Sequence, residues 1–338
     1  MSSVDYDVAE SMARNLALAG SSCKRIDIQL TNEKFCAKTW MLFLVAFRSM
    51  NHSVVDLIIR GDPLTHVQAV PTMLWHFRNL EKLTFIPSGM EWRKEDWEAL
   101  AGALRHHSTL ERLHVLFPRR SITSRQFGFV ESLSSVSRLK QLHLVGGCGQ
   151  RSKTATKAET IPSSSSGGQR RRDNDISLTL LANIIRGCRH LKTVFCQNIR
   201  IVGTTSGGRS LAFSEAICNS TLKELRLENC SLDEKTLTAI ATATKDMRTL
   251  RTLDLRGNCI GIRAASTLIT TLQHNPSIER LYLSHALVED ICLIELEALL
   301  DNNPTVASVL WLDQSDFSRF EQVPNCLPTQ VGPNYQTN

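Results

Sequence analysis

One short stretch of the sequence could bind a phosphate group. Residues 203–210 read GTTSGGRS, which is close to the glycine-rich loop whose backbone amides and lysine hold the phosphates of a nucleotide. Arg209 stands where that loop needs lysine, and no acidic strand for a magnesium ion clearly follows. We interpret 203–210 as an enlarged loop between a strand and a helix, and we predict no nucleotide or other cofactor.

Cysteines and histidines could bind a metal ion, but their spacing is wrong for it. The C-terminal half contains Cys188, Cys196, Cys218, Cys230 and Cys259, without the paired spacing of zinc ligands. We expect these cysteines to pack as small apolar residues, with oxidation of neighbouring thiols as the alternative. His114 and His143 are expected about 5 Å apart on adjacent strands, but two ligands are too few, so we predict no metal.

A repeating pattern explains where these residues lie. The motif apolar-x-x-apolar-x-apolar recurs along the chain. The middle apolar residues of its copies are Ile26, Leu57, Leu83, Leu113, Leu142, Val194, Leu225, Leu253, Leu281 and Val309. They are 26 to 31 residues apart, except for one interval of 52 that contains a Ser-, Gly- and Arg-rich insertion. Such a period predicts a stacked repeat architecture.

Each repeat predicts a strand, a turn and a helix. The alternating leucines indicate a short strand with one buried face, and segments such as 235–246 and 263–275 have helical periodicity. A single unit of this kind cannot bury its apolar face, so neighbouring units must stack on a continuous core. The predicted fold is an α/β solenoid of about ten units, with a parallel sheet inside and helices outside.

The pattern resembles the leucine-rich repeat family, of the ribonuclease-inhibitor type. The resemblance covers about residues 4 to 316 and is most specific in the units that hold Cys230 and Asn258, where the family has Cys or Asn bonding to loop backbone. It implies a horseshoe with a helix on the convex side of each unit. Other units depart from the family at this position, with Asp62, Ser88, Pro118, Gly147, Ile199 and Ala286.

We divide the chain into four regions. Repeats occupy 1–147, where 4–19 has the pattern of a helix without its strand, and repeats resume at 177–320. Residues 148–176 form a basic Ser/Gly-rich insertion and 321–338 a polar, proline-containing tail, and we expect both to be disordered. The N-terminal helix either caps the solenoid or marks a chain shorter than its ancestor.

Composition narrows the possible partners and compartment. The net charge is +6, and residues 148–176 carry +3 of it, so the body is nearly balanced and we do not expect it to bind nucleic acid. We find no signal peptide and no apolar run long enough to span a membrane. We expect a monomer in the cytoplasm, with the nucleus as the alternative, and its ten cysteines reduced.

The outward residues of the predicted strands form the candidate binding site. We predict that a protein partner contacts an apolar and aromatic centre followed by charged residues and a tyrosine. These residues are Ile86, His114, Leu116, His143, Val145, Phe195, Arg226, Glu228, Asp254, Arg256 and Tyr282. Charge reversal at Arg226 or Arg256 is expected to weaken binding without changing the folding transition.

The predicted function is therefore protein recognition without catalysis. No nucleophile–base pair or carboxylate cluster stands out in the sequence. A small-GTPase regulator resembling the Ran GTPase-activating protein is one alternative, although that family has an acidic C-terminal region that this chain lacks. A substrate receptor of a ubiquitin ligase is another, for which an F-box bundle would have to precede residue 4.

Overall fold

A computed structural model describes most of the repeat region. It covers residues 22–30, 37–61, 69–87, 94–117, 124–147, 176–202, 208–258, 261–284 and 308–312, with single positions near both ends of the chain. The following description is restricted to these residues.

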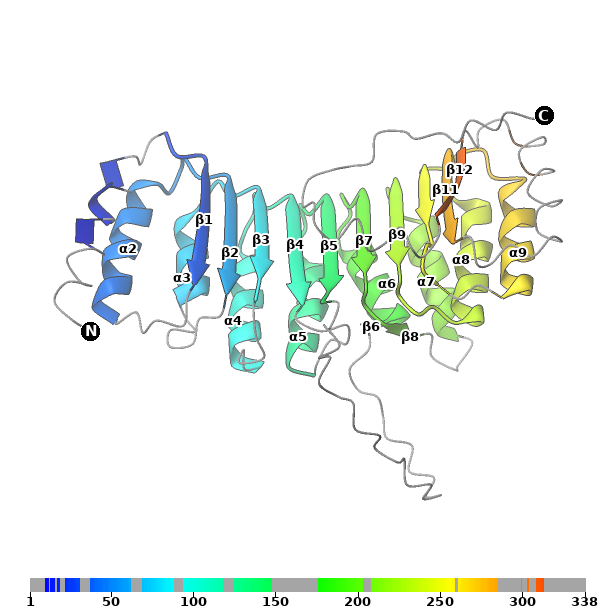
Figure 1. Ribbon diagram of the computed structural model, residues 1–338, viewed down its shortest axis with the longest axis horizontal. Helices are drawn as coiled ribbons and strands as arrows, with labels where there is room; N and C mark the ends of the chain where they lie inside the picture. Colours follow the sequence, from blue (N-terminus) through cyan, green and yellow to red (C-terminus); the bar gives the residue numbers. More distant parts are fainter. Residues whose placement is uncertain are drawn as a thin grey trace, which may run out of the picture.

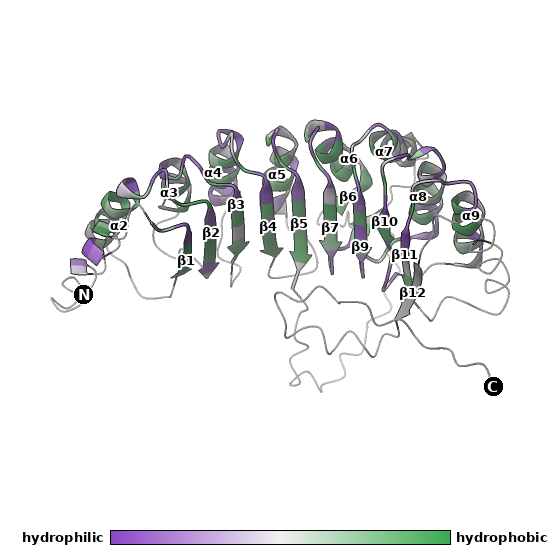
Figure 2. Cartoon of the chain, turned by 90° about the horizontal axis from the view of Figure 1, so that it is seen from above, coloured by the Kyte–Doolittle hydropathy of each residue, from purple (hydrophilic) through white to green (hydrophobic). Residues whose placement is uncertain are grey.

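The chain builds one long parallel sheet on the inner side of a curved solenoid (Figures 1 and 2). Its strands pair in the order β1-β2-β3-β4-β5-β7-β9-β10-β11-β12. Their bounds are β1 Arg25–Leu30, β2 Asp56–Gly61, β3 Lys82–Ile86, β4 Arg112–Phe117, β5 Gln141–Gly146, β7 Thr193–Gln197, β9 Glu224–Glu228, β10 Thr252–Asp254, β11 Arg280–Ser284 and β12 Ser308–Leu312. The sheet confirms the fold class that the repeat predicts.

Helices cover the outer side of this sheet, one between most pairs of strands (Figure 2). They are α2 Ala37–Ser49, α3 Ala69–His76, α4 Lys94–Arg105, α5 Ser124–Ser132 with the 3-10 turn η1 Leu133–Ser135, α6 Leu178–Gly187, α7 Gly208–Cys218, α8 Glu234–Asp246 and α9 Ile262–Leu272. A second, two-stranded sheet pairs β6 Ile176–Ser177 with β8 Ile201–Val202. None of the described helices is both long enough and apolar enough to cross a membrane.

The strand register follows the repeat residue by residue. Ile26 lies opposite Leu57, Leu57 opposite Leu83, and so on through Leu281 opposite Val309. The middle apolar residues of all ten copies are therefore in line across the sheet. From Leu57 to Leu281 they are at most 2% exposed, so this line of side chains is the centre of the core. Burial of such a line in every unit is what makes the repeats stack.

The turn after several strands adopts a left-handed backbone conformation. Asn198, Asn229 and Gly257 occupy the same turn position in successive units, with φ of 55°, 51° and 70°. Asparagine and glycine tolerate this region far better than other residues. The sharp turn exposes backbone groups that need partners, and the following residue supplies them.

Asn258 is that residue, and it joins two units. Its buried Oδ1 accepts hydrogen bonds from the amides of Cys230 at 3.0 Å and Leu232 at 3.3 Å. Its Nδ2 donates to the carbonyls of Leu227 at 2.6 Å and Leu255 at 2.8 Å. This confirms the family expectation for Asn258, and Cys230 and Ile199 fill the equivalent positions as fully buried side chains.

A second ladder lies at the opposite end of the strands. Thr109, Thr221 and Thr249 each come two or three residues before a strand, and each Oγ1 donates to carbonyls of the preceding unit, at Leu80, Leu191 and Leu222. Asn275 and Asn303 make similar bonds farther along the chain, to Met247 and to Leu272. Sequence reasoning missed these residues, although the recurring Thr-Leu pair was a usable signal.

Two of the predicted boundaries can be compared with the structure. Ile176 is not part of a disordered insertion, because it lies in β6, is 1% exposed and pairs with Ile201. Residues 148–175 and the predicted tail 321–338 lie outside the described residues. Of the predicted N-terminal helix, the described positions 10, 11, 13–15, 17 and 18 are helical.

Candidate recognition surface

The inner face of the sheet brings the predicted site residues into two columns. One column runs across the sheet from Thr84 through His114, His143, Phe195, Arg226 and Asp254 to Tyr282. The other contains Leu116, Val145, Gln197 and Glu228, with Ile86 at the same place on β3 and Arg256 just beyond β10. The period of the repeat therefore assembles side chains that are up to about 200 residues apart in sequence.

Three rings form a continuous row in the middle of the first column. The centroids of His114 and His143 are 5.6 Å apart, and those of His143 and Phe195 are 5.4 Å apart. Both contacts are edge-to-face, a favourable arrangement for aromatic rings. We call His114, His143 and Phe195 the aromatic strip, and all three side chains are half-buried.

The aromatic strip is uncharged near neutral pH. The pKa of His143 is lowered to about 4, mainly by burial and also by the positive charges of protonated His114, Arg226 and Lys82. Burial, helped by Lys82, also lowers the pKa of His114. The Nε2 atom of His114 is covered from solvent and has no hydrogen-bond partner among the described residues. The strip therefore has an apolar character with one unmet hydrogen-bonding atom.

Half-buried aliphatic side chains run beside the strip in the second column. They are Ile86, Leu116 and Val145, on β3, β4 and β5. Together with the rings they make a continuous apolar area on the inner face. The structure thus brings together the apolar residues that the sequence predicts as the centre of the site.

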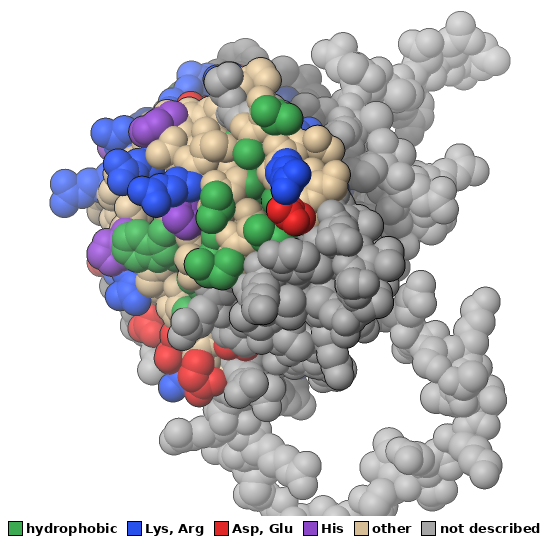
Figure 3. Space-filling view, turned by 90° about the vertical axis from the view of Figure 1, so that its left-hand side faces the viewer, with side chains coloured by type: hydrophobic (Ala, Val, Ile, Leu, Met, Phe, Trp, Pro, Cys, Tyr) green, Lys and Arg blue, Asp and Glu red, His purple; other side chains and the backbone are tan. Residues whose placement is uncertain are grey.

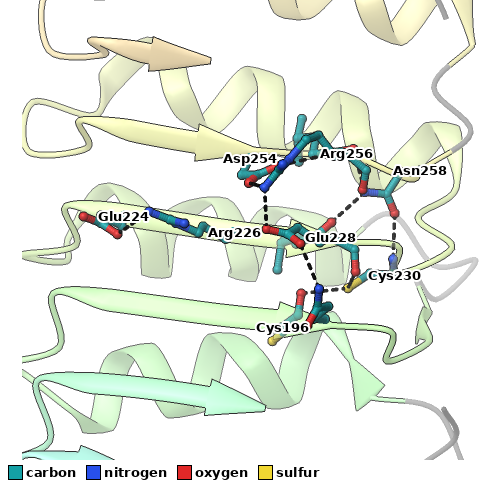
Figure 4. Close-up of polar contacts among 11 residues, drawn as sticks. Cys196, Glu224, Arg226, Glu228, Cys230, Asp254, Arg256 and Asn258 are labelled. Atoms are coloured by element: carbon teal, nitrogen blue, oxygen red, sulfur yellow. Dashed lines mark hydrogen bonds and ion pairs between the residues drawn. The ribbon is translucent and has the colours of Figure 1, made fainter. Parts of the chain in front are cut away.

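The charged residues of the predicted site are arranged differently. Arg256 donates from Nε to Asp254 Oδ1 at 2.8 Å and from Nη2 to Asp254 Oδ2 at 2.6 Å (Figure 4). The same Nη2 contacts Glu228 Oε1 at 2.7 Å, while Glu228 Oε2 accepts from Gln197 at 3.1 Å. We call Glu228, Asp254 and Arg256 the charged cluster.

The charged cluster corrects one expectation. Sequence reasoning treated Glu228 and Asp254 as outward contact residues because their positions alternate with the inward leucines. In the structure Asp254 is 0% exposed and Glu228 is 6% exposed, since the arginine fork covers both carboxylates. Their hydrogen-bonding capacity is used within the chain, and a charge reversal at Arg256 would disturb the fold as well as the surface.

Two carboxylates on one arginine affect the protonation of the cluster. The pKa of Glu228 is raised to about 7, mainly by burial and also by the negative charge of Asp254, against the effect of Arg256. Although burial opposes it, hydrogen bonds and charge from Asp254 and Glu228 raise the pKa of Arg256. The guanidinium carbon of Arg256 lies 5.2 Å from the ring centroid of Tyr282, which extends the cluster by a cation–π contact.

Arg226 lies between the aromatic strip and the charged cluster. Its Nη2 donates to Glu224 Oε2 at 3.2 Å, and Glu224 is a partner that sequence reasoning missed. A signal was present, because residues i and i+2 of a strand share one face. The Nε atom of Arg226 is buried and has no hydrogen-bond partner among the described residues, while the side chain as a whole is 21% exposed.

The candidate chemical sites have no reactive geometry where the structure describes them. Burial raises the pKa of Cys188 and of Cys196 to about 12, so these thiols stay protonated. No group of three or more potential metal ligands occurs among the described residues. Gly208 begins α7, while 203–207 and Cys259 lie outside the described residues. Trp97 is 1% exposed and packs against Phe85 and Phe129.

In-register repetition of one strand-turn-helix unit, with an asparagine bonding two successive turns, is the architecture that the resemblance implies. This chain has a leucine-rich repeat fold. Its outer layer of helices is that expected of the ribonuclease-inhibitor type.

Comparisons with known proteins give distant similarities. No family model matches this chain. NLR family CARD domain-containing protein 4 of Xenopus tropicalis is 30% identical over 152 residues, which are 44% of this chain and 14% of that protein. The chain therefore spans a small part of that relative's length.

Solved structures give similarities at lower identity. The leucine-rich repeat-containing protein LegL7 from Legionella pneumophila is 14% identical, with a TM-score of 0.49 over 89% of this chain and 88% of that one. The TLR13–ssRNA13 complex is 13% identical, with a TM-score of 0.38 over 86% of this chain and 42% of that one.

Proposed function

We propose that this leucine-rich repeat protein is a non-catalytic scaffold that binds a protein partner on the inner face of its sheet. The observation that carries the proposal is the aromatic strip with its aliphatic neighbours Ile86, Leu116 and Val145. Contiguous apolar area that a solvent-facing sheet keeps partly exposed is typical of a binding surface. Aromatic residues and arginine are also the types most enriched among residues that dominate binding energies.

The proposal separates the roles of the predicted site residues. The aromatic strip and the aliphatic column provide the apolar contact, and Arg226 provides a charged contact at its edge. The charged cluster and Tyr282 hold the neighbouring strands in place and limit the partner's footprint on that side.

Co-purification of the full-length tagged chain tests the proposal. We expect Phe195→Glu, which places a charge in the aromatic strip, to lower recovery of the bound protein at least tenfold, a loss of about 1.4 kcal/mol or more. The control is Lys245→Glu, which changes an exposed side chain on the outer helix α8. Equal recovery with Phe195→Glu and with wild type, at unchanged thermal stability, would contradict binding on the inner face.

No observation on the described residues favours the two alternative functions. The GTPase-regulator and ubiquitin-ligase hypotheses remain predictions from the sequence. Stimulation of GTP hydrolysis by a small GTPase, measured with the purified chain, would support the first of them.

A further inference from the structure

The outer layer of helices carries an exposed tryptophan near the N-terminal end of the solenoid. Trp75 belongs to the last turn of α3 and is 57% exposed. Met41 and Val45, one helical turn apart on α2, are 60% and 66% exposed. On α3 and α4 most described apolar residues are buried, as Leu74 and Leu104 are, and on α2 Ala46 and Phe47 are buried. Large apolar side chains in such positions need an explanation that core packing does not supply.

Arginines flank this tryptophan at equivalent places on the two neighbouring helices. Arg48, Trp75 and Arg105 each follow a buried residue of the last helical turn, on α2, α3 and α4 in turn. The helices pack side by side, so the three side chains form a row. Figure 3, which faces the N-terminal end, shows hydrophobic, basic and histidine side chains gathered together on the helical side.

A ring contact links α3 to the end of α4. The ring of Trp75 lies 5.1 Å from that of His106, which follows α4. Burial and the nearby charge of Arg48 lower the pKa of His76. Arg78, on the loop after α3, adds a third exposed arginine. We call Met41, Val45, Arg48, Trp75, Arg78, Arg105 and His106 the convex patch.

The convex patch contains no acidic residue. The three stretches that build it, 41–55, 69–80 and 99–110, have three arginines and no Asp or Glu. None of these arginines forms an ion pair within the part of the chain that the structure describes. A cation at a helix C-terminus complements the helix dipole, which accounts for one arginine per helix. It does not account for the exposed tryptophan between them.

We propose that the convex patch is a docking surface for an acidic, amphipathic protein segment. Trp75, with Met41 and Val45, takes the apolar side of the segment, and the arginines pair with its carboxylates. Arginine suits this role because its planar fork binds a carboxylate through two hydrogen bonds. Surface attraction to anionic lipid usually needs a cluster of about four to eight Lys or Arg residues, more than the patch offers. A protein segment therefore fits better than a membrane.

The same part of another unit shows that the repeat does not dictate the patch. On α8 the positions equivalent to Trp75 and His76 are Lys245 and Asp246, an exposed and charge-balanced pair. The proposal concerns the outer face, so it does not depend on binding at the inner face.

Fluorescence anisotropy with the purified full-length chain and labelled model peptides tests the proposal. The probe is a helical peptide of about 16 residues, roughly four turns, with glutamate on one face and leucine on the other. A second peptide has lysine for every glutamate. We expect the acidic peptide to bind and the basic peptide not to bind. We expect Trp75→Ala to raise the dissociation constant about tenfold. Lys245→Glu, the matched control on α8, should change it less than about twofold.

Reversing the charge of two arginines gives the most decisive test of the proposal. The Arg48→Glu and Arg105→Glu double variant should lose the acidic peptide and gain the basic one. Both arginines are exposed but lie at helix C-termini, so the charge reversal should lower the thermal unfolding temperature by only a few degrees. Equal binding of both peptides to the wild type, or acidic-peptide affinity unchanged by Trp75→Ala, would overturn the proposal. So would tighter binding to phosphatidylserine vesicles than to the acidic peptide, with the same loss in the double variant.

Discussion

Two neighbouring regions of the inner face differ in how they use their polar groups. In the aromatic strip the histidines are neutral, and an Nε2 atom has no partner among the described residues. In the charged cluster each carboxylate of Glu228 and Asp254 is bound by Arg256, and Gln197 completes the arrangement. The strip lies on β4, β5 and β7, and the cluster lies on β9, on β10 and just beyond β10.

This difference distinguishes a binding surface, the aromatic strip, from a group of residues that stabilises the fold, the charged cluster. Polar groups that are already paired gain little from a partner, while removing one of them leaves another buried and unpaired. An apolar strip contributes little internal bonding, but it loses contact with water when a partner binds. We therefore expect substitutions in the charged cluster to change stability and substitutions in the aromatic strip to change binding.

The largest effect on stability is expected from Asp254→Ala. The substitution removes both hydrogen bonds that Asp254 accepts from the Arg256 side chain. It leaves Glu228 as the remaining carboxylate partner of that half-buried cation. We expect the free energy of unfolding to fall by about 3 kcal/mol, which urea denaturation followed by circular dichroism would measure.

Asp27→Ala provides the matched control. Asp27 also pairs with an arginine on the inner face, Arg60, but both side chains are nearly half exposed. Exposed pairs contribute at most about 1 kcal/mol and often less. If the two substitutions had equal effects, the charged cluster would be no more structural than a surface ion pair.

The pH dependence of stability should change in opposite directions in the two regions. His143 has a pKa of about 4 in the folded chain, against the ordinary value of 6.5. Between these pH values the unfolded chain binds a proton at this residue and the folded chain does not. Its contribution to stability is present above pH 6.5 and is lost as pH falls towards 4, by at most about 3 kcal/mol. His143→Gln should remove this loss.

Glu228 acts in the other direction. Its pKa of about 7 exceeds the ordinary 4.5, so its contribution is present below pH 4.5 and is lost as pH rises through 7. Urea denaturation at several values between pH 4.5 and 7 should show stability rising with pH in Glu228→Gln and falling with pH in His143→Gln. Parallel profiles in the two variants would contradict the difference between the regions.

The sequence predicted the frame of the molecule because one rule repeats ten times. Leucine spacing placed the middle apolar residue of every strand in the observed register, and the family resemblance implied the bonding role of Asn258. It also predicted that His114 and His143 would be neighbours. These features depend on periodicity and on the burial of apolar side chains, which can be read along a single chain.

The local arrangement of the side chains could not be predicted in the same way. Alternation indicated correctly that Glu228 and Asp254 point to the inner face, but not that Arg256 would cover them. That outcome depends on side-chain conformations and on the balance between desolvation and pairing. Trp75 was missed because the exposure of one helical residue depends on its neighbours in space.

Photo-crosslinking from position 195 tests the central claim most directly. A photoreactive phenylalanine analogue replaces Phe195 in one variant and Lys245 in another, and both are irradiated in cells and analysed by mass spectrometry. We predict that position 195 crosslinks one protein, that His143→Glu in the same chain abolishes the product, and that position 245 does not crosslink that protein. The same product from position 245, or its persistence with His143→Glu, would contradict recognition through the aromatic strip.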